Sequence, residues 1–199
     1  MPDRTIPFYN TILRCDGYTA RDITVPEGFG IRPYQPGDEH DWARMEQTIG
    51  DFDTVQQAER YFTQTYLRDA DKRDRILFAV NAEGSVVGSC IAWQDPRQGG
   101  QAASLHWLVV DAAYRNRGLG RALCGSVMKQ FADKGEMPVY IHTQPWSWKA
   151  ILLYLSMGFR LQRQDSFAGY INEYDKAMET LREVVSAEQF AKMQQHSQY

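Results

Sequence analysis

The segment Arg115–Arg121 has the residue types and spacing to bind a diphosphate. It follows an apolar run ending in Val109-Val110, and apolar residues recur at helical spacing after it. Its glycines let backbone amides approach a ligand closely, and a first helical turn offers N–H groups without partners inside the helix. Its three arginines add positive charge. Taken alone, the segment is also compatible with a plain strand-to-helix turn in which glycine only relieves strain.

A second segment with chemical potential lies downstream, where Tyr154 stands four residues before Gly158-Phe159. The two patterns, Arg115-x-x-Gly118-x-Gly120 and Tyr154-x-x-x-Gly158-Phe159, occur in an order and at a separation that resemble the GNAT superfamily of N-acetyltransferases. The resemblance covers roughly residues 29–160 and is more specific for the pair than for either pattern alone.

This resemblance implies acetyl-CoA as co-substrate, bound where two parallel strands splay apart, here Leu105–Val110 and Val139–Thr143. Val109 and Val110 fall where the family pairs strand backbone with the pantetheine arm. The positions that the resemblance assigns to the pyrophosphate are Arg115, Asn116, Arg117, Gly118, Leu119, Gly120 and Arg121. Ser147 opens the tyrosine helix near the cofactor, where the family often has Asn. Serine caps helices well, but the side-chain amide is lost.

The resemblance also assigns Tyr154 to the general acid that protonates the departing thiolate. A phenol with a pKa of ~10 can donate to a thiolate whose conjugate acid has a pKa of ~8.5. The alternative is a core-facing helix aromatic, since Leu152 and Leu155 flank it.

The general base is predicted to be His106, where many members of the superfamily carry Glu nine residues before the motif arginine. A histidine with an ordinary pKa of ~6.5 is a good base near neutral pH, directly or through a water. Strand alternation predicts that His106 and Trp107 face opposite sides of the sheet. A structural histidine is the alternative, and His142 on the neighbouring strand is the reserve candidate.

The elements that must position these residues follow from periodicity. Helices are predicted around Trp42–Ile49 and Val55–Tyr66, from Gly118 to Lys134, over Ser147–Met157 and over Tyr174–Val184; strands are predicted at Gly30–Tyr34, Ile76–Asn81, Val86–Trp93, Ser104–Val110, Pro138–Gln144 and Arg160–Arg163. The order predicts an α/β fold with a mixed sheet, antiparallel in its first half and with one parallel crossover in its second half. The resemblance implies a GNAT-like central sheet with flanking helices.

Three parts of the chain are predicted: an N-terminal extension (1–28), an acetyltransferase domain (29–165), and a C-terminal helix and tail (166–199). The superfamily normally finishes with a strand, whereas this chain turns to a helix after Phe159, so its last strand is expected to be missing or displaced. The end, Gln194–Tyr199, is expected to fray.

Composition excludes several classes of protein. The 199 residues carry 22 Lys+Arg against 25 Asp+Glu, and without a basic stripe nucleic acid is not an expected partner. No apolar run approaches the ~20 residues of a membrane span, and Met1–Asn10 lacks a signal-peptide pattern, which predicts a cytoplasmic protein. Cys15, Cys90 and Cys124 are odd in number and widely spaced, which argues against a disulfide framework or a metal site.

The predicted function is therefore an acetyl-CoA-dependent N-acetyltransferase in which an amine attacks the thioester directly within a ternary complex. The alternative is a GNAT-like acyl-CoA-binding sensor or scaffold without turnover. Nucleotide binding through the arginine-glycine loop alone is disfavoured, since nothing in the sequence would hold Mg²⁺ and a triphosphate. The amine acceptor is open, and so is the oligomeric state, including a homodimer.

Overall fold

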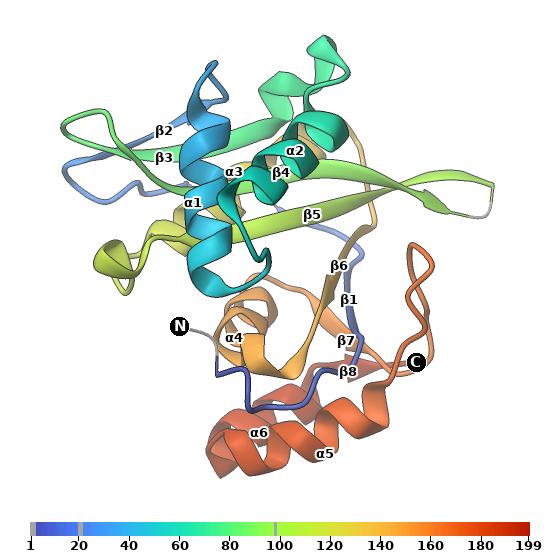
Figure 1. Ribbon diagram of the computed structural model, residues 1–199. Helices are drawn as coiled ribbons and strands as arrows, with labels where there is room; N and C mark the ends of the chain where they lie inside the picture. The colour runs from blue at the N-terminus through green and yellow to red at the C-terminus, as the bar shows by residue number, and fades with distance from the viewer. Residues whose placement is uncertain (1–2, 20–21, 98) are drawn as a thin grey trace. The chain divides into compact units, whose positions relative to one another are not determined.

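The computed structural model describes residues 3–19, 22–97 and 99–199 (Figure 1). The chain divides into two compact units. The first is chiefly Ala20–Trp93 with Leu105–Gln130, and the second comprises Pro2–Thr19, Gln94–Ser104 and Phe131–Tyr199. The strands follow one order, β2-β3-β4-β5-β6-β1-β7-β8, and the long strands β4 and β5 contribute residues to both units.

The first unit contains the antiparallel half of the sheet. Its elements are β2 (Phe29–Pro33), α1 (Asp38–Ile49), α2 (Val55–Tyr66), a 3-10 helix η1 (Ala70–Arg75), β3 (Ile76–Asn81), the start of β4 (Val86–Arg97), the end of β5 (Gly100–Val110), a 3-10 helix η2 (Ala112–Tyr114) and most of α3 (Leu119–Asp133). β3 pairs antiparallel with both β2 and β4.

Both helices that precede β3 have clear start signals. α1 begins with three acidic residues in its first turn, which suits the positive end of the helix dipole. It ends at Gly50, whose φ of 85° is a left-handed stop. α2 begins with a capping box, in which the Thr54 hydroxyl accepts from the N–H of Gln57 and the Gln57 side chain accepts from the N–H of Thr54.

α1 and α2 cover one face of the strands (Figure 1). An aromatic core joins these helices to the strands. Trp42, Phe62, Tyr66 and Phe78 are fully buried in it. A second set of rings is only partly buried and packs against that core: Tyr34, Phe52, Tyr61, Trp93 and Trp107. Helical spacing on α1 and α2 therefore delivers large rings to the sheet, as their sequence pattern predicts.

The second unit contains the parallel pair and the sheet edge. Its elements are β1 (Thr11–Cys15), the hairpin ends of β4 and β5, β6 (Val139–Thr143), a 3-10 helix η3 (Pro145–Ser147), α4 (Trp148–Ser156), β7 (Arg160–Gln162), α5 (Tyr174–Val184), α6 (Ala187–Gln195) and β8 (Ser197–Gln198). β5 and β6 run parallel, with Ala103 opposite Val139 and Ser104 opposite Tyr140.

The predicted mixed α/β fold is confirmed, but the strands nearest the two ends of the sequence, β1 and β8, were missed. β1 lies within the predicted extension 1–28, of which residues 1–2 and 20–21 are outside the described residues. It pairs antiparallel with both β6 and β7, so β7 gains a neighbour from the opposite end of the chain. β1 therefore lies between β6 and β7 in the sheet.

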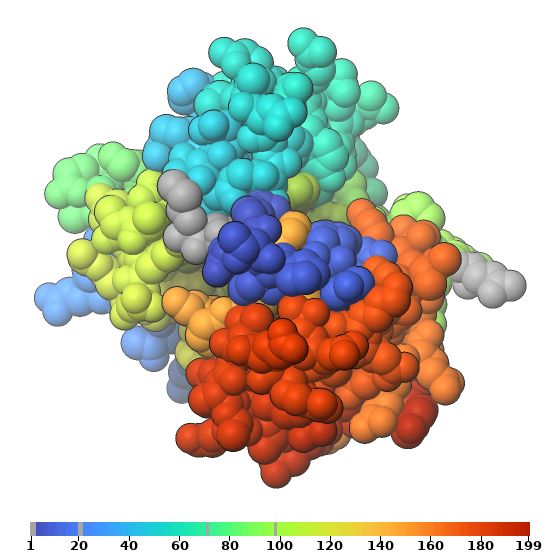
Figure 2. Space-filling model, turned by 60° about the horizontal axis from the view of Figure 1, so that its bottom comes forward, coloured from blue at the N-terminus to red at the C-terminus, as the bar shows by residue number. Residues whose placement is uncertain are grey.

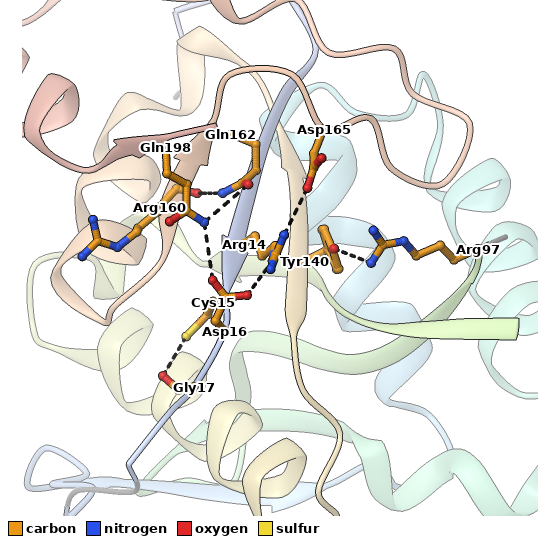
Figure 3. Close-up of polar contacts among 10 residues, drawn as sticks. All are labelled: Arg14, Cys15, Asp16, Gly17, Arg97, Tyr140, Arg160, Gln162, Asp165 and Gln198. Carbon is orange, nitrogen blue, oxygen red and sulfur yellow. Dashed lines mark hydrogen bonds and ion pairs between the residues drawn. The ribbon is translucent and has the colours of Figure 1, made fainter. Parts of the chain in front are cut away.

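The expectation of a frayed tail is wrong. α6 is a separate helix with a Ser186–Gln189 capping box, and the following β8 pairs parallel with β7. The Gln198 side-chain amide is 3.5 Å from the Gln162 side-chain oxygen and 3.5 Å from an Asp16 carboxylate oxygen (Figure 3). The tail is held because a two-residue strand and its side-chain amide both find partners.

The N-terminal segment is also held in place in this unit. Two hydrogen bonds join Asn10 and Glu173: the Glu173 N–H donates to the Asn10 carbonyl (2.9 Å), and the Asn10 N–H donates to the Glu173 side-chain carboxylate (3.1 Å). The dark-blue N-terminal residues lie against the orange C-terminal residues on the face shown in Figure 2. None of the helices within the described residues is long and apolar enough to span a membrane.

Candidate active site

The arginine-glycine loop leaves β5 through η2 and leads into α3. Asn116 (φ 61°) and Gly118 (φ 89°) have left-handed backbone conformations, whereas Arg117 between them does not have a positive φ. Backbone that alternates in this way turns successive N–H groups toward one side and makes a concave anion site. Asn116, Arg117 and Gly118 are exposed, so this backbone is accessible to a ligand.

The loop is anchored to β5 by the first arginine of the motif. The Arg115 Nε–H donates to the carbonyl of Val110 at 2.9 Å, which fixes where the loop begins. The Arg117 guanidinium lies over the Tyr114 ring, 5.5 Å from its centroid. Arg115 therefore has a structural partner within the strand, and Arg117 remains at the exposed part of the loop.

α3 starts directly after the second left-handed residue. Leu119 is 1% exposed and fastens the helix start to the core, while Gly120 is partly exposed and Arg121 is exposed. The Ala122 N–H donates to the Gly118 carbonyl at 3.0 Å, so the N–H groups before Ala122 precede the first helical hydrogen bond. The helix dipole adds partial positive charge at this end.

Asp111, which sequence reasoning did not single out, lies between β5 and η2 and links the start of the loop to α1. Its carboxylate accepts from the Ala113 N–H at 3.0 Å and from the Arg44 guanidinium at 3.1 Å. Burial raises the pKa of Asp111, but these donors outweigh burial and hold the pKa below its ordinary value. A sequence signal for this role does exist: an Asp that directly follows an apolar strand can accept a hydrogen bond from the backbone N–H two residues later.

Val109 and Val110 differ in their surroundings. The Val109 side chain is 4% exposed and belongs to the aromatic core of the first unit, whereas Val110 is partly exposed. The Asp111 N–H, one residue on, donates to the Val87 carbonyl at 2.9 Å. This end of β5 is thus held on its β4 side.

His106 and Trp107 do not face opposite sides, so the prediction from strand alternation is wrong. Trp107 has φ 50°, a left-handed conformation that breaks the two-residue repeat of β5. Both side chains reach the hydroxyl of Tyr66 on α2: His106 Nδ1 lies 2.8 Å from it, and the Trp107 indole N–H donates to it at 2.7 Å. Tyr66 was predicted only as part of a helix face.

His142, the reserve candidate, has an arrangement of its own in the second unit. Its Nε2 lies 2.8 Å from the side-chain oxygen of Asn10. The Tyr170 ring stacks on it, with centroids 3.5 Å apart and an interplanar angle of 8°. The Phe8 ring lies edge-on to the His142 ring, with centroids 6.3 Å apart. The histidine is therefore held from two directions by segments far apart in the sequence.

Tyr154 and Ser147 lie on α4 in the second unit. Tyr154 is 5% exposed, and its ring lies 5.9 Å from that of Phe159, which follows the helix. Ser147 is the N-cap residue of α4, but its hydroxyl accepts from the Gln144 side chain at 2.9 Å and not from the helix. The prediction that the Ser147 side chain caps the helix is therefore wrong.

The predicted residues fall into two groups. His106, Val109, Val110 and the loop Arg115–Arg121 belong to the first unit, and Ser147 and Tyr154 belong to the second. Within the described parts of the chain, no group of three or more His, Cys, Asp or Glu side chains is arranged to hold a metal ion. The described cysteines, Cys15, Cys90 and Cys124, are buried and carry no disulfide.

Known proteins resemble this chain in sequence. The sequence model of the acetyltransferase (GNAT) family matches residues 40–159. A mycothiol acetyltransferase from Pseudarthrobacter chlorophenolicus is 28% identical over 165 residues, which cover 76% of this chain and 49% of that protein. Human N-acetyltransferase 8 is 30% identical over 107 residues, which cover 53% of this chain and 46% of that protein. The chain spans about half the length of these curated relatives.

A solved structure supports the same fold. A GCN5-related N-acetyltransferase from Sphaerobacter thermophilus superposes with a TM-score of 0.61 at 22% identity, covering 77% of this chain and 48% of that one. The family match spans more than half of this chain and includes the arginine-glycine loop, the strand that carries His106 and the helix that carries Tyr154. The chain belongs to the acetyltransferase (GNAT) family.

Proposed function

We propose that this protein is an acetyl-CoA-dependent N-acetyltransferase, with residues 29–165 as its acetyltransferase domain. The observation that carries the proposal is the exposed backbone of Asn116–Gly118, with its alternating left-handed residues, directly before the start of α3. These residues fit a diphosphate, since concave N–H groups, a helix start and the cation of Arg117 all favour bound negative charge. Acetyl-CoA supplies such a diphosphate and an activated thioester.

Binding would extend from this loop along β5. The residues proposed to contact acetyl-CoA are Val109, Val110, Arg115, Asn116, Arg117, Gly118, Leu119, Gly120, Arg121 and Ser147. Val110 is partly exposed, and Arg115 is already engaged with its carbonyl. We therefore assign the diphosphate contacts chiefly to the loop amides and to Arg117, and give Arg115 the role of holding the loop in shape.

His106 is proposed to act as the general base. An amine acceptor arrives as an ammonium with a pKa of ~10 and must lose a proton before its lone pair can attack the thioester carbonyl. A histidine can take that proton, directly or through a water. The contact between its Nδ1 and the buried Tyr66 hydroxyl supports this choice, since catalytic bases are held in fixed orientation. His142 is the reserve.

Tyr154 is proposed to act as the general acid. When the tetrahedral intermediate collapses, the C–S bond breaks and the electron pair stays on sulfur. The phenol then gives its proton to the thiolate, which leaves as the free thiol. The near-complete burial of Tyr154 favours a role in which water is excluded from the donor.

The acceptor class is proposed as a primary amine. The two named relatives are a mycothiol acetyltransferase and an N-acetyltransferase, and both names support acetyl transfer as the reaction.

A thiol-release assay over a panel of amines, paired with calorimetry of acetyl-CoA binding, tests this proposal. We expect acetyl-CoA to bind and at least one amine to release free thiol above the rate of hydrolysis. Binding without turnover of any amine would favour the sensor or scaffold alternative. Absence of binding would refute the cofactor assignment itself.

A further inference from the structure

We propose that Tyr66 is a positioning residue for the reaction, which holds the imidazole of His106 in its working orientation. The inference rests on the proposed function, in which His106 is the base. Tyr66 is the last residue of α2, and His106 lies forty residues later on β5. Their contact is therefore made by the tertiary fold.

The hydrogen-bond chemistry of the Tyr66 hydroxyl suits this role. The indole N–H of Trp107 can only donate, so the Tyr66 oxygen is the acceptor in their 2.7 Å contact. A hydroxyl oxygen has two lone pairs and one proton, and it can therefore meet His106 Nδ1 as donor or as acceptor. The 2.8 Å contact can persist whether the imidazole is neutral or protonated. The base stays oriented in both states of a proton transfer.

The Tyr66 side chain is fully buried and confined by neighbouring rings. It is 0% exposed, and its ring packs edge-on against Trp93 at 4.7 Å and an interplanar angle of 81°. On the same helix, the ring centroids of Phe62 and Tyr61 lie 5.6 Å and 6.0 Å from that of Tyr66. A hydroxyl on a ring confined in this way defines a fixed point in space, which is what a positioning residue requires.

The left-handed backbone of Trp107 brings this arrangement about. A bulky residue with φ 50° is unusual, and such strain persists only where the surroundings over-determine it. Here the centroid of the Trp107 ring lies 5.4 Å from that of Trp42 and 5.7 Å from that of Phe52. The backbone carbonyl of Trp107 accepts a hydrogen bond from the Ser89 hydroxyl at 3.3 Å. The kink turns two consecutive side chains to the same hydroxyl, which regular strand geometry forbids.

The test compares Tyr66→Phe with Tyr61→Phe. Both changes remove one hydroxyl from the same aromatic cluster, but the Tyr61 hydroxyl has no hydrogen bond among the described residues. With an accepted amine, we expect Tyr66→Phe to lower kcat about tenfold or more and to leave the KM and Kd for acetyl-CoA within about twofold. Tyr61→Phe should stay within about twofold of the parent in all three constants.

A double-mutant cycle with His106→Gln separates positioning from general damage. If Tyr66 acts through His106, Tyr66→Phe should cost nothing further once His106 is replaced. A full additional loss in the double mutant would overturn the proposal, and so would a normal kcat in Tyr66→Phe. If His106→Gln itself keeps normal kcat, the base assignment is what fails.

Two further measurements cover the case in which Tyr66→Phe does not fold. Nitrogen-15 NMR of the parent protein, with the His106 signals assigned through His106→Gln, should show Nδ1 in a hydrogen bond. An Nδ1 without one would overturn the proposal. Trp107→Phe removes the indole donor together with part of the ring, and we expect a smaller loss of kcat that also disappears in the His106→Gln background. A loss that persists in that background would count against the proposal.

Discussion

A Cβ atom placed on Gly88 would lie only 2.9 Å from the backbone carbonyl oxygen of Val109. The same atom would lie 3.1 Å from a methyl carbon of Leu123 on α3. β4 therefore has no space for any side chain at this position, between a strand carbonyl and a helix. Val109 is one of the strand residues proposed to contact the cofactor, and its carbonyl can approach β4 this closely because residue 88 is glycine.

The first prediction is that Gly88→Ala destabilises the protein by about 1–3 kcal/mol, the usual cost of overpacking a tight core. Neither a strand carbonyl nor a buried leucine can yield freely, and the melting temperature should fall. The matched control is Gly30→Ala on β2, where a Cβ would meet only a Val80 methyl at an ordinary 3.5 Å. Equal melting temperatures for the two variants would contradict the close approach.

Gly120→Glu should weaken acetyl-CoA binding about tenfold or more, which corresponds to about 1.4 kcal/mol. The substitution places a negative side chain in the first turn of α3, where the proposal seats a diphosphate. Calorimetric titration of a variant with an unchanged far-ultraviolet spectrum is the measurement. Parent-like affinity in a folded variant would remove the cofactor assignment.

His106→Gln should abolish the acidic limb of the kcat/KM profile. The limb arises when a base becomes protonated, and glutamine has no titrating group. The profile is recorded with a saturating co-substrate and an amine whose own titration is measured separately. If the limb persists in the variant, it belongs to another group, and His142→Gln is the next variant to record.

Tyr154→Phe should lower kcat and kcat/KM together, by about 10²–10⁴-fold, and should leave acetyl-CoA affinity almost unchanged. In the proposed mechanism the lost hydroxyl is a proton donor needed only as the thiolate leaves, so its effect falls on the transition state. Steady-state rates and calorimetry on the same preparation measure both quantities.

The fold of that variant is checked by its melting temperature with and without acetyl-CoA. The ring that packs beside Phe159 is retained, so folding should suffer little. A variant with near-normal kcat would make Tyr154 a packing residue and leave the thiolate to be protonated by water.

Above pH ~10, the ordinary pKa of tyrosine, the protein should lose stability through Tyr34. Burial and the hydrogen bond to the Glu39 carboxylate raise the pKa of Tyr34 to about 12. A pKa raised on folding means that the folded state keeps its proton longer. This contribution to stability is therefore complete below the unfolded pKa and is lost as pH rises through the folded one.

Urea unfolding from about pH 9 to about pH 11 measures the effect, and Tyr34→Phe is the control. The free energy of unfolding should fall more steeply with pH in the parent than in the variant. Parallel curves would show that Tyr34 titrates alike in the folded and unfolded states.

Local patterns in the sequence were enough to predict much of the fold and the position of the arginine-glycine loop at the start of a helix. The helical spacing of Trp42 and Phe62 and the glycine spacing of Gly118-x-Gly120 depend on near neighbours in the chain, which act through backbone geometry and the start of a helix. These interactions are present in any fold that contains the segment. The predicted helices and the loop at the start of α3 are accordingly found where their residues indicated.

Contacts between distant segments were decided only by the tertiary structure. β1 has few sequence signals of its own and is a strand because β6 and β7 supply partners on both sides. The left-handed backbone at Trp107 could not be anticipated from a residue that prefers regular strand geometry. It is stabilised by Trp42, Phe52 and the Tyr66 hydroxyl, which come from other elements. The resemblance to the superfamily could nominate His106, but its partner was determined by the packing of α2 on the sheet. Such packing sums many long-range contacts that no local window contains.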